Sequence, residues 1–217
     1  MNGRRWLLGL SAAGLAGGCA ETMTTPAALP QSGPEGGSTE IRTVGGSELD
    51  AARNAYYRAL DSGTRRVRIQ VDRVDTAAIY WATLETPALR SLRRDALALY
   101  ELWTPEQRAA ENIKDTEVHN GRWTFSVVLY TQDSRDNLVS RSGSSGVRAF
   151  LLTQNGDRLE PIEVRKHETP RSRIEWLYPH KDRFSTVWQI VFPEPQNPGP
   201  VELQLTGPGF VSATSWE

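Results

Sequence analysis

The sequence predicts an α+β fold in which an N-terminal helical segment, with one or two strands, packs on a C-terminal antiparallel β-sandwich. Apolar residues recur at helical spacing through the middle of the chain, whereas after residue 120 they alternate with polar ones. Six or seven short strand-like segments, separated by Gly, Pro and Asn, then follow over about 100 residues. A chain of 217 residues that is 38% hydrophobic can bury a core without disulfides.

Three helices are expected before residue 116, and each begins at a hydroxyl residue. A Ser or Thr at this position accepts a hydrogen bond from a free backbone N–H of the first turn. Proline follows the cap in the second and third helices, where its fixed φ suits the first helical position. In the third, Gln107 is placed to complete a capping box. The expected helices cover residues 47–63, 86–103 and 104–115.

Two strands are expected between the first two helices. In residues 65–74 the side chains of Val67, Ile69 and Val71 alternate with polar ones, which indicates a half-buried strand. Residues 79–84 have strong strand propensity, although a buried helical segment has the same apolar character.

The C-terminal half is expected to consist of strands joined by tight turns. Asn155-Gly156 is typical of a hairpin turn, and Trp216 is expected to seal the edge of the core. The arrangement resembles in outline the immunoglobulin-like or transthyretin-like modules found among envelope lipoproteins, a likeness of fold that does not carry function. The expected strands are residues 123–130, 147–153, 158–165, 173–178, 186–192, 201–205 and 210–216.

The first nineteen residues have the order of an export signal. Arg4 and Arg5 precede an apolar run over residues 6–16, which is too short to span a hydrocarbon core that needs about 20 residues. Gly17, Gly18 and the only cysteine, Cys19, then follow. This ending resembles the lipobox of bacterial lipoproteins, which implies cleavage after Gly18 and acylation of Cys19. The alternative is an ordinary signal cut after Ala20.

The residues after Cys19 are expected to act as a disordered tether, because their polar, Pro- and Gly-rich composition offers little to bury. Ala20 in place of Asp favours outer-membrane over inner-membrane sorting, and the Arg4-Arg5 pair leaves both general and twin-arginine export open. The expected organisation is a signal peptide over residues 1–18, the lipidated cysteine and tether over 19–46, a helical segment over 47–116 and a β-sandwich over 117–217.

Charge and composition exclude several function classes. The net charge of −1 gives no general attraction to nucleic acid. Beyond the signal no second apolar segment approaches the length of a membrane span, so the lipid is the expected link to the membrane. No phosphate-binding or dinucleotide motif is present, and no cofactor is predicted.

The sequence shows no catalytic or metal-binding motif. His119, His167 and His180 do not have the spacing of a metal site, so solvated loop histidines are expected. The serine-rich segment over residues 142–146 lacks the nucleophile-elbow spacing and is expected to be a loop. Paired carboxylates are conceivable among Asp72, Asp75 and Glu85, but exposed charges are the expected state of these side chains.

Two groups of side chains are candidates for partner binding. The first is basic, and its members Arg90, Arg93 and Arg94 share one side of the second expected helix. A further basic group, over residues 65–68, lies on an expected strand. For both groups, a solvated surface is the ordinary explanation. The second is aromatic and comprises Trp176, Tyr178 and Trp188, which form either an exposed platform or, as we expect, part of the core.

The sequence therefore favours a lipid-anchored cell-envelope protein that faces the periplasm and acts as a non-catalytic binding, scaffolding or assembly module. The expected partner is an unidentified envelope protein or polymer. The alternative is an envelope hydrolase whose carboxylates converge only in the fold. A pocket with two or more carboxylates or histidines would favour the hydrolase, whereas an uncovered apolar patch on a sheet without such a pocket would favour the binder. A third possibility places the partner surface on the helices over residues 86–115.

Overall fold

The computed structural model describes residues 46–70, 76–132, 138–141, 146–168, 170–196 and 199–217. The expected signal peptide, Cys19 and the tether up to residue 45 lie outside the described residues, as do Asp72, Asp75 and residues 142–145. Within the described ranges, no helix has the length and apolar character that a membrane crossing requires.

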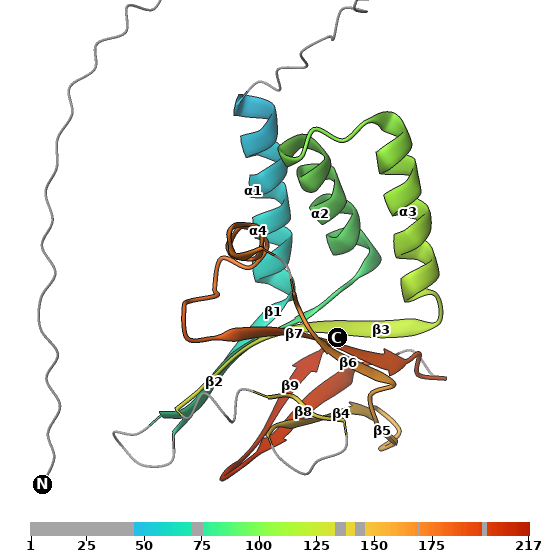
Figure 1. Cartoon of the computed structure of the whole chain (residues 1–217). Helices are drawn as coiled ribbons and strands as arrows, with labels where there is room; N and C mark the ends of the chain where they lie inside the picture. Colours follow the sequence, from blue (N-terminus) through green and yellow to red (C-terminus); the bar gives the residue numbers. More distant parts are fainter. Residues whose placement is uncertain (1–45, 71–75, 133–137, 142–145, 169, 197–198) are drawn as a thin grey trace, which may run out of the picture. The chain divides into compact units, whose positions relative to one another are not determined.

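The described residues form an α+β fold, as the sequence predicts (Figure 1). A five-stranded and a four-stranded sheet are built from antiparallel strand pairs. The helices are α1 (Gly46–Gly63), α2 (Pro87–Tyr100), α3 (Pro105–His119) and α4 (Arg171–Leu177). The larger sheet has the order β1 (Thr64–Gln70), β2 (Thr76–Leu84), β3 (Arg122–Thr131), β7 (Thr186–Pro193) and β6 (Glu163–Lys166). The smaller sheet has the order β5 (Arg158–Leu159), β4 (Arg148–Thr153), β8 (Val201–Gly207) and β9 (Phe210–Trp216).

The two sheets contribute to one hydrophobic core. Phe125 and Ile190 of the larger sheet belong to the same buried cluster as Leu151 and Leu203 of the smaller one. Phe125 also makes an edge-to-face contact with Trp216, with ring centroids 5.1 Å apart. Trp216 is buried, as expected, and its indole N–H donates to the carbonyl oxygen of Gly63 at 2.9 Å.

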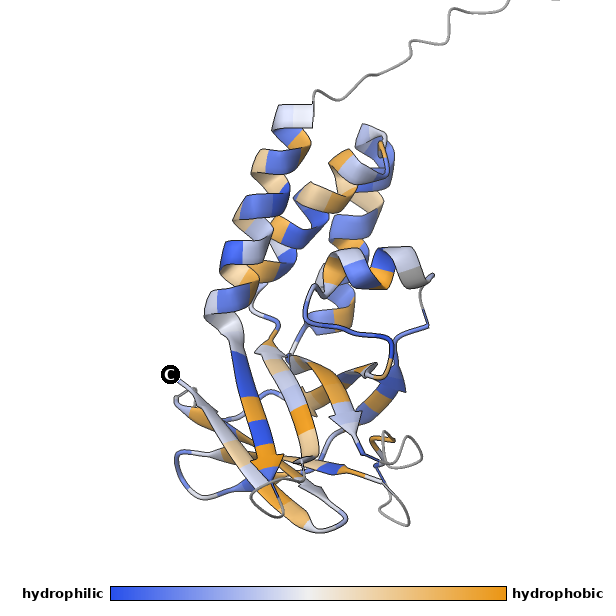
Figure 2. Cartoon of the chain, turned by 90° about the vertical axis from the view of Figure 1, so that its left-hand side faces the viewer, coloured by the Kyte–Doolittle hydropathy of each residue, from blue (hydrophilic) through white to orange (hydrophobic). Residues whose placement is uncertain are grey.

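The helices pack on the other side of the larger sheet, away from the shared core (Figures 1 and 2). Leu97 of α2 and Ile174 of α4 share a buried cluster with Val128 of β3 and Val187 of β7. A further cluster joins α1 to α2, and it contains Tyr56, Leu60, Leu89 and Ala96. Helix α3 differs from the other long helices, because none of its apolar residues is buried.

The structure corrects two of the expected strands. Residues 173–178 were expected as a strand but lie in α4 and its C-cap; Ile174 and Leu177, three residues apart, both face the helical cluster. Residues 158–165 were expected as one strand but divide into β5 and β6, which belong to different sheets. Pro161 lies between them, and proline cannot donate to a strand ladder.

The other expected elements are found within the described residues; of the strand expected over residues 65–74, residues 65–70 lie in β1 and residues 71–74 lie outside the described ranges. Residues 79–84 belong to strand β2, so the helical alternative for them is wrong. The Asn155-Gly156 turn joins β4 to β5, with Gly156 at a φ of 85° and its N–H donating to the carbonyl of Thr153.

The N-terminus of α3 carries the predicted capping box. The Gln107 N–H donates to Thr104 Oγ1 at 3.3 Å, and the Thr104 N–H donates to Gln107 Oε1 at 2.8 Å. Replacing Thr104 by alanine should destabilise α3 by about 1 kcal/mol. Because none of the apolar residues of α3 is buried to hold it, its amides should exchange about five-fold faster.

Thr86→Ala at the cap of α2 is the matched control, since α2 is held by buried side chains such as Leu89 and Leu97. Thr86→Ala should lower the free energy of global unfolding, and it should not selectively increase amide exchange in α2. Unchanged amide exchange in α3 of Thr104→Ala would contradict the prediction.

Candidate functional site

The candidate site is a group of charged and polar side chains between the helices and the larger sheet. Glu85, which follows β2, is 3% exposed. Its Oε2 accepts a hydrogen bond from Arg93 Nη1 of α2 at 2.8 Å, and its Oε1 accepts one from the Ser126 hydroxyl of β3 at 2.6 Å. The Ser126 and Tyr178 hydroxyls are 3.0 Å apart. The expectation of an exposed Glu85 is therefore wrong: its carboxylate is buried and both oxygens have partners.

Burial and charge shift the pKa values in this group. Burial lowers the pKa of Arg93, but the charge and hydrogen bond of Glu85, together with Tyr178 and Tyr56, raise it by more, so the net pKa is raised. Arg93 therefore stays charged. Burial, with a smaller contribution from Glu85, raises the pKa of Tyr178 to about 12, which keeps its phenol protonated.

A second charged group joins α2 to α3 around Asp115. Its Oδ2 accepts a hydrogen bond from Arg90 Nε at 3.1 Å and also forms an ion pair with Arg94. Burial alone would raise the pKa of Asp115, but the hydrogen bond and charge of Arg90, together with Arg94, lower it. Arg94 Nε also donates to the side-chain oxygen of Asn112 at 2.8 Å. These polar contacts connect α3, which buries none of its apolar residues, to α2.

His119 ends α3 and is held in the same group. Only 5% of its side chain is exposed, so the expectation of a solvated histidine is wrong here. Its Nδ1 lies 2.9 Å from Thr124 Oγ1, and its Nε2 lies 3.6 Å from Asp115 Oδ1. Burial, followed by the charge of Arg90, lowers the pKa of His119 to about 4. The imidazole is therefore neutral at pH 7.

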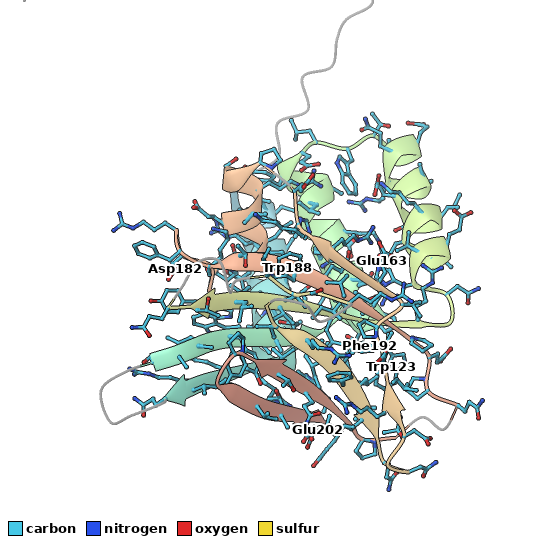
Figure 3. The ribbon with its side chains drawn as sticks, turned by 60° about the horizontal axis from the view of Figure 1, so that its bottom comes forward. Trp123, Glu163, Asp182, Trp188, Phe192 and Glu202 are labelled. Carbon is cyan, nitrogen blue, oxygen red and sulfur yellow. The ribbon has the colours of Figure 1, made fainter. Side chains whose placement is uncertain are left out.

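A pocket of about 250 Å³ opens beside these two groups. Trp123, which lies opposite Phe192 in the β3–β7 ladder (Figure 3), contributes to its wall together with Leu84 and Pro87. Its polar lining comes from Glu85, Arg90, His119, Arg122, Thr124 and Glu194. The pocket thus combines an apolar wall with groups that can donate and accept protons or hydrogen bonds.

The structure brings the three predicted arginines together, but not as an exposed basic face. Arg93 pairs with Glu85, and Arg90 and Arg94 pair with Asp115. The exposed fractions of the three side chains are 11%, 15% and 20% for Arg90, Arg93 and Arg94. Their contacts hold the helices on the sheet.

The three predicted aromatic residues do not form an exposed platform. Tyr178 and Trp188 are buried, in agreement with the core alternative. Trp176 lies in α4 and is half-buried, with its ring stacked on Tyr100 at 5.0 Å and on Tyr56 at 6.2 Å. Tyr56 and Tyr57 of α1 donate hydrogen bonds to the carbonyls of Leu177 and Trp176, which fixes α4 against α1.

The remaining candidates lie apart from this site. On β1, Arg66 lies over the Trp81 ring at 5.5 Å, and Arg65 over Trp216 at 6.0 Å. His180 forms a 3.2 Å pair with Asp61, and burial lowers the pKa of His167. In the part of the chain that the structure describes, no group of three His, Cys, Asp or Glu side chains is arranged to hold a metal ion.

Sequence reasoning missed Ser126 as a member of the site, and it predicted Tyr178 only as one of three aromatic candidates, not as a hydroxyl partner of Ser126. Ser126 is one polar residue within the buried strand β3, and it lies 41 positions from Glu85 and 52 from Tyr178. The sequence signal for Ser126 was its place as a polar residue in a mostly apolar strand, because a buried hydroxyl needs a hydrogen-bond partner. Neither a protein-family model nor any curated protein matches this sequence.

Proposed function

We propose that this chain is an exported bacterial lipoprotein, anchored through Cys19 on the periplasmic side of the cell envelope and acting there as a non-catalytic binding, scaffolding or assembly module. One observation carries the proposal: the only cysteine follows Gly17-Gly18 at the end of a short apolar run that begins after two arginines. Ala20 favours the outer membrane as its destination. The partner is an envelope protein or polymer.

The geometry of the candidate site supports a structural role for its charges. Both oxygens of Glu85 are hydrogen-bonded, and Asp115 is shared between two arginines. Groups that are paired in this way fix the helices on the sheet and have less freedom to act on a substrate.

We infer that the two sheets form a β-sandwich of immunoglobulin-like or transthyretin-like outline. The antiparallel pairing within each sheet and the core shared by Phe125, Ile190, Leu151 and Leu203 support this.

The outer face of α3 is the best candidate for the partner surface. Ile113 on this helix is 62% exposed, so its apolar side chain is available for contact with a partner. A photoactivatable crosslinker at Ile113 in growing cells should capture the partner. The same crosslinker at Val211 of β9, which is 66% exposed and lies on a different element, is the matched control.

Acylation at Cys19 has a direct test. Cells that produce the chain should incorporate labelled palmitate into it, and Cys19→Ser should abolish the label and release the protein from the membrane fraction. Ala20→Ser is the control variant, and it should keep both. If Cys19→Ser keeps the label and the membrane association, the lipoprotein proposal is wrong.

The pocket beside the site favours one alternative, an envelope hydrolase. Glu85, His119 and Glu194 all line it, which supplies two carboxylates and a neutral histidine. Glu194 is the variant to test, since substitution of Glu85 would disturb the buried ion pair. Hydrolysis of purified cell-wall polymer or ester substrates that is lost in Glu194→Gln, with folding unchanged, would favour the enzyme.

A further inference from the structure

The turn between α2 and α3 holds a leucine in a backbone conformation that leucine rarely adopts. Leu102 has a φ of 55°, the only positive φ of a non-glycine residue in the described ranges. The Trp103 N–H donates to the Ala98 carbonyl at 2.9 Å, which is the long hydrogen bond of a Schellman motif. Glycine is usual at the position of Leu102, because a side chain there costs conformational energy.

The strain at Leu102 does not serve to bury its side chain. Leu102 is 53% exposed, and Tyr100 beside it is 43% exposed. The carboxylate of Glu101 accepts a hydrogen bond from the Trp103 indole at 2.9 Å and pairs with Arg173 at 3.1 Å. The one charge within the turn is therefore neutralised, and the turn exposes Leu102 and Tyr100 beside Trp103, which is half-buried against the helical cluster.

The chain enters the described structure beside this turn. Helix α1 starts at Gly46, and its Glu48 lines the same pocket as Leu102 and Trp103. Figure 1 shows the start of α1 and the α2–α3 turn at the same end of the fold. The sequence predicts a tether over the 27 residues from Ala20 to Gly46, and a flexible coil of that length has a mean reach of roughly 30 Å.

We propose that the α2–α3 turn, with Leu102, Trp103 and Tyr100, docks on the interface of the phospholipid bilayer that carries the anchor. This inference rests on the proposed acylation of Cys19, since the tether then holds the turn close to the membrane. Trp and Tyr favour the headgroup region, and leucine favours the acyl boundary just below it. The apolar area is too small for strong binding alone, but a short tether supplies an effective concentration in the millimolar range.

The surrounding charges determine the kind of lipid surface. Glu48 and Arg108 both line the pocket at the turn, so the two signs are mixed there. Docking should therefore depend on apolar contact, and it should be insensitive to anionic lipid and to salt.

The test does not depend on acylation in cells, because the single cysteine allows chemical coupling. The mature chain from Cys19 is coupled through that thiol to maleimide-bearing lipid in phosphatidylcholine vesicles whose acyl chains are brominated. Bromine quenches tryptophan fluorescence at close range. The quenching due to Trp103 is the quenched fluorescence of the unaltered chain minus that of its Trp103→Phe variant. If the turn docks, this difference should be clearly greater than zero.

Leu102→Asn and Leu102→Gly are the decisive variants. Both residues accept positive φ, so the urea midpoint should stay the same or rise. The ratio of docked to free turns should nevertheless fall about five-fold, because the variants lose the transfer free energy of the exposed half of the leucine side chain. Val211→Thr on β9 removes another exposed apolar group and should leave quenching unchanged.

Three results would overturn the proposal. The first is absence of Trp103 quenching in the coupled chain, and the second is equal quenching in Leu102→Asn. The third is quenching that needs anionic lipid and disappears between about 0.05 and 0.5 M salt, which would indicate electrostatic attraction. A self-association that is lost in Leu102→Asn while quenching is absent would assign the turn to contact with a second copy. Palmitate labelling of Cys19 decides the anchor separately.

Discussion

Replacing Arg93 by alanine is expected to lower the free energy of unfolding by about 3–5 kcal/mol, the largest effect among the charged residues of this protein. The substitution leaves the Glu85 carboxylate buried without its counter-charge, with only 1% of that side chain exposed. The hydrogen bond from Ser126 remains, but it cannot replace a full positive charge at 2.8 Å. Urea unfolding at pH 7 measures the loss.

A double-substitution cycle separates the ion pair from its burial cost. Arg93→Met combined with Glu85→Leu removes both charges, and should be much less destabilising than Arg93→Ala alone. Arg53→Ala is the matched control, because Arg53 pairs with Asp50 at the surface, with exposed fractions of 38% and 55%. Its effect should stay within about 1 kcal/mol. An Arg93→Ala effect as small as that of Arg53→Ala would show that Glu85 is solvated.

Local sequence signals predicted most of the helices and strands. The caps at Thr86 and Thr104 define the starts of α2 and α3, since the hydroxyl accepts a hydrogen bond from the first turn and the proline after it suits the first helical position. Alternation in residues 201–205 predicts β8, whose buried and half-buried residues alternate. These signals operate over a few residues, which is why the sequence alone is enough to read them.

The errors arose where tertiary contacts decide the structure. The segment over residues 173–178 has strand-like composition, but its carbonyls accept hydrogen bonds from Tyr56 and Tyr57, about 120 positions earlier. Glu85 follows a strand and precedes a helix cap, a position typical of an exposed loop. Its burial depends on Arg93 and Ser126 closing over it from two other elements. No periodic pattern in the sequence predicts such contacts between residues of different elements.

Acidification should destabilise the protein between about pH 6.5 and 4, through His119. The folded pKa of His119 is lowered to about 4, whereas an unfolded histidine titrates near its ordinary value of about 6.5. Within that window the unfolded chain binds a proton that the folded chain does not, so stability falls as the pH falls. The shift corresponds to about 3 kcal/mol over the window. Urea unfolding at pH 7 and at pH 4.5 measures it.

His119→Asn is the variant that isolates this contribution. It removes the titrating group and keeps a polar atom near Thr124, so its stability should fall less on acidification than that of the unaltered chain. His167, whose pKa is also lowered, adds to the same window and accounts for part of the remaining pH dependence. The Asp115 contribution is lost only at lower pH, because its pKa lies below its ordinary value. The same pH dependence in both chains would contradict the assignment to His119.

The position of His119 indicates where the protein should open first at low pH. Protonation places a positive charge beside Arg90, in a group whose contacts join α3 to α2. Since α3 buries none of its apolar residues and is held mainly by polar contacts, separating it from α2 costs less than unfolding β3 or β7, which lie in the main core. Amide exchange at pH 4.5, corrected for intrinsic rates, should therefore increase in α3 while β3 and β7 stay protected. An equal increase in all three elements would show instead that the histidine titrates only on global unfolding.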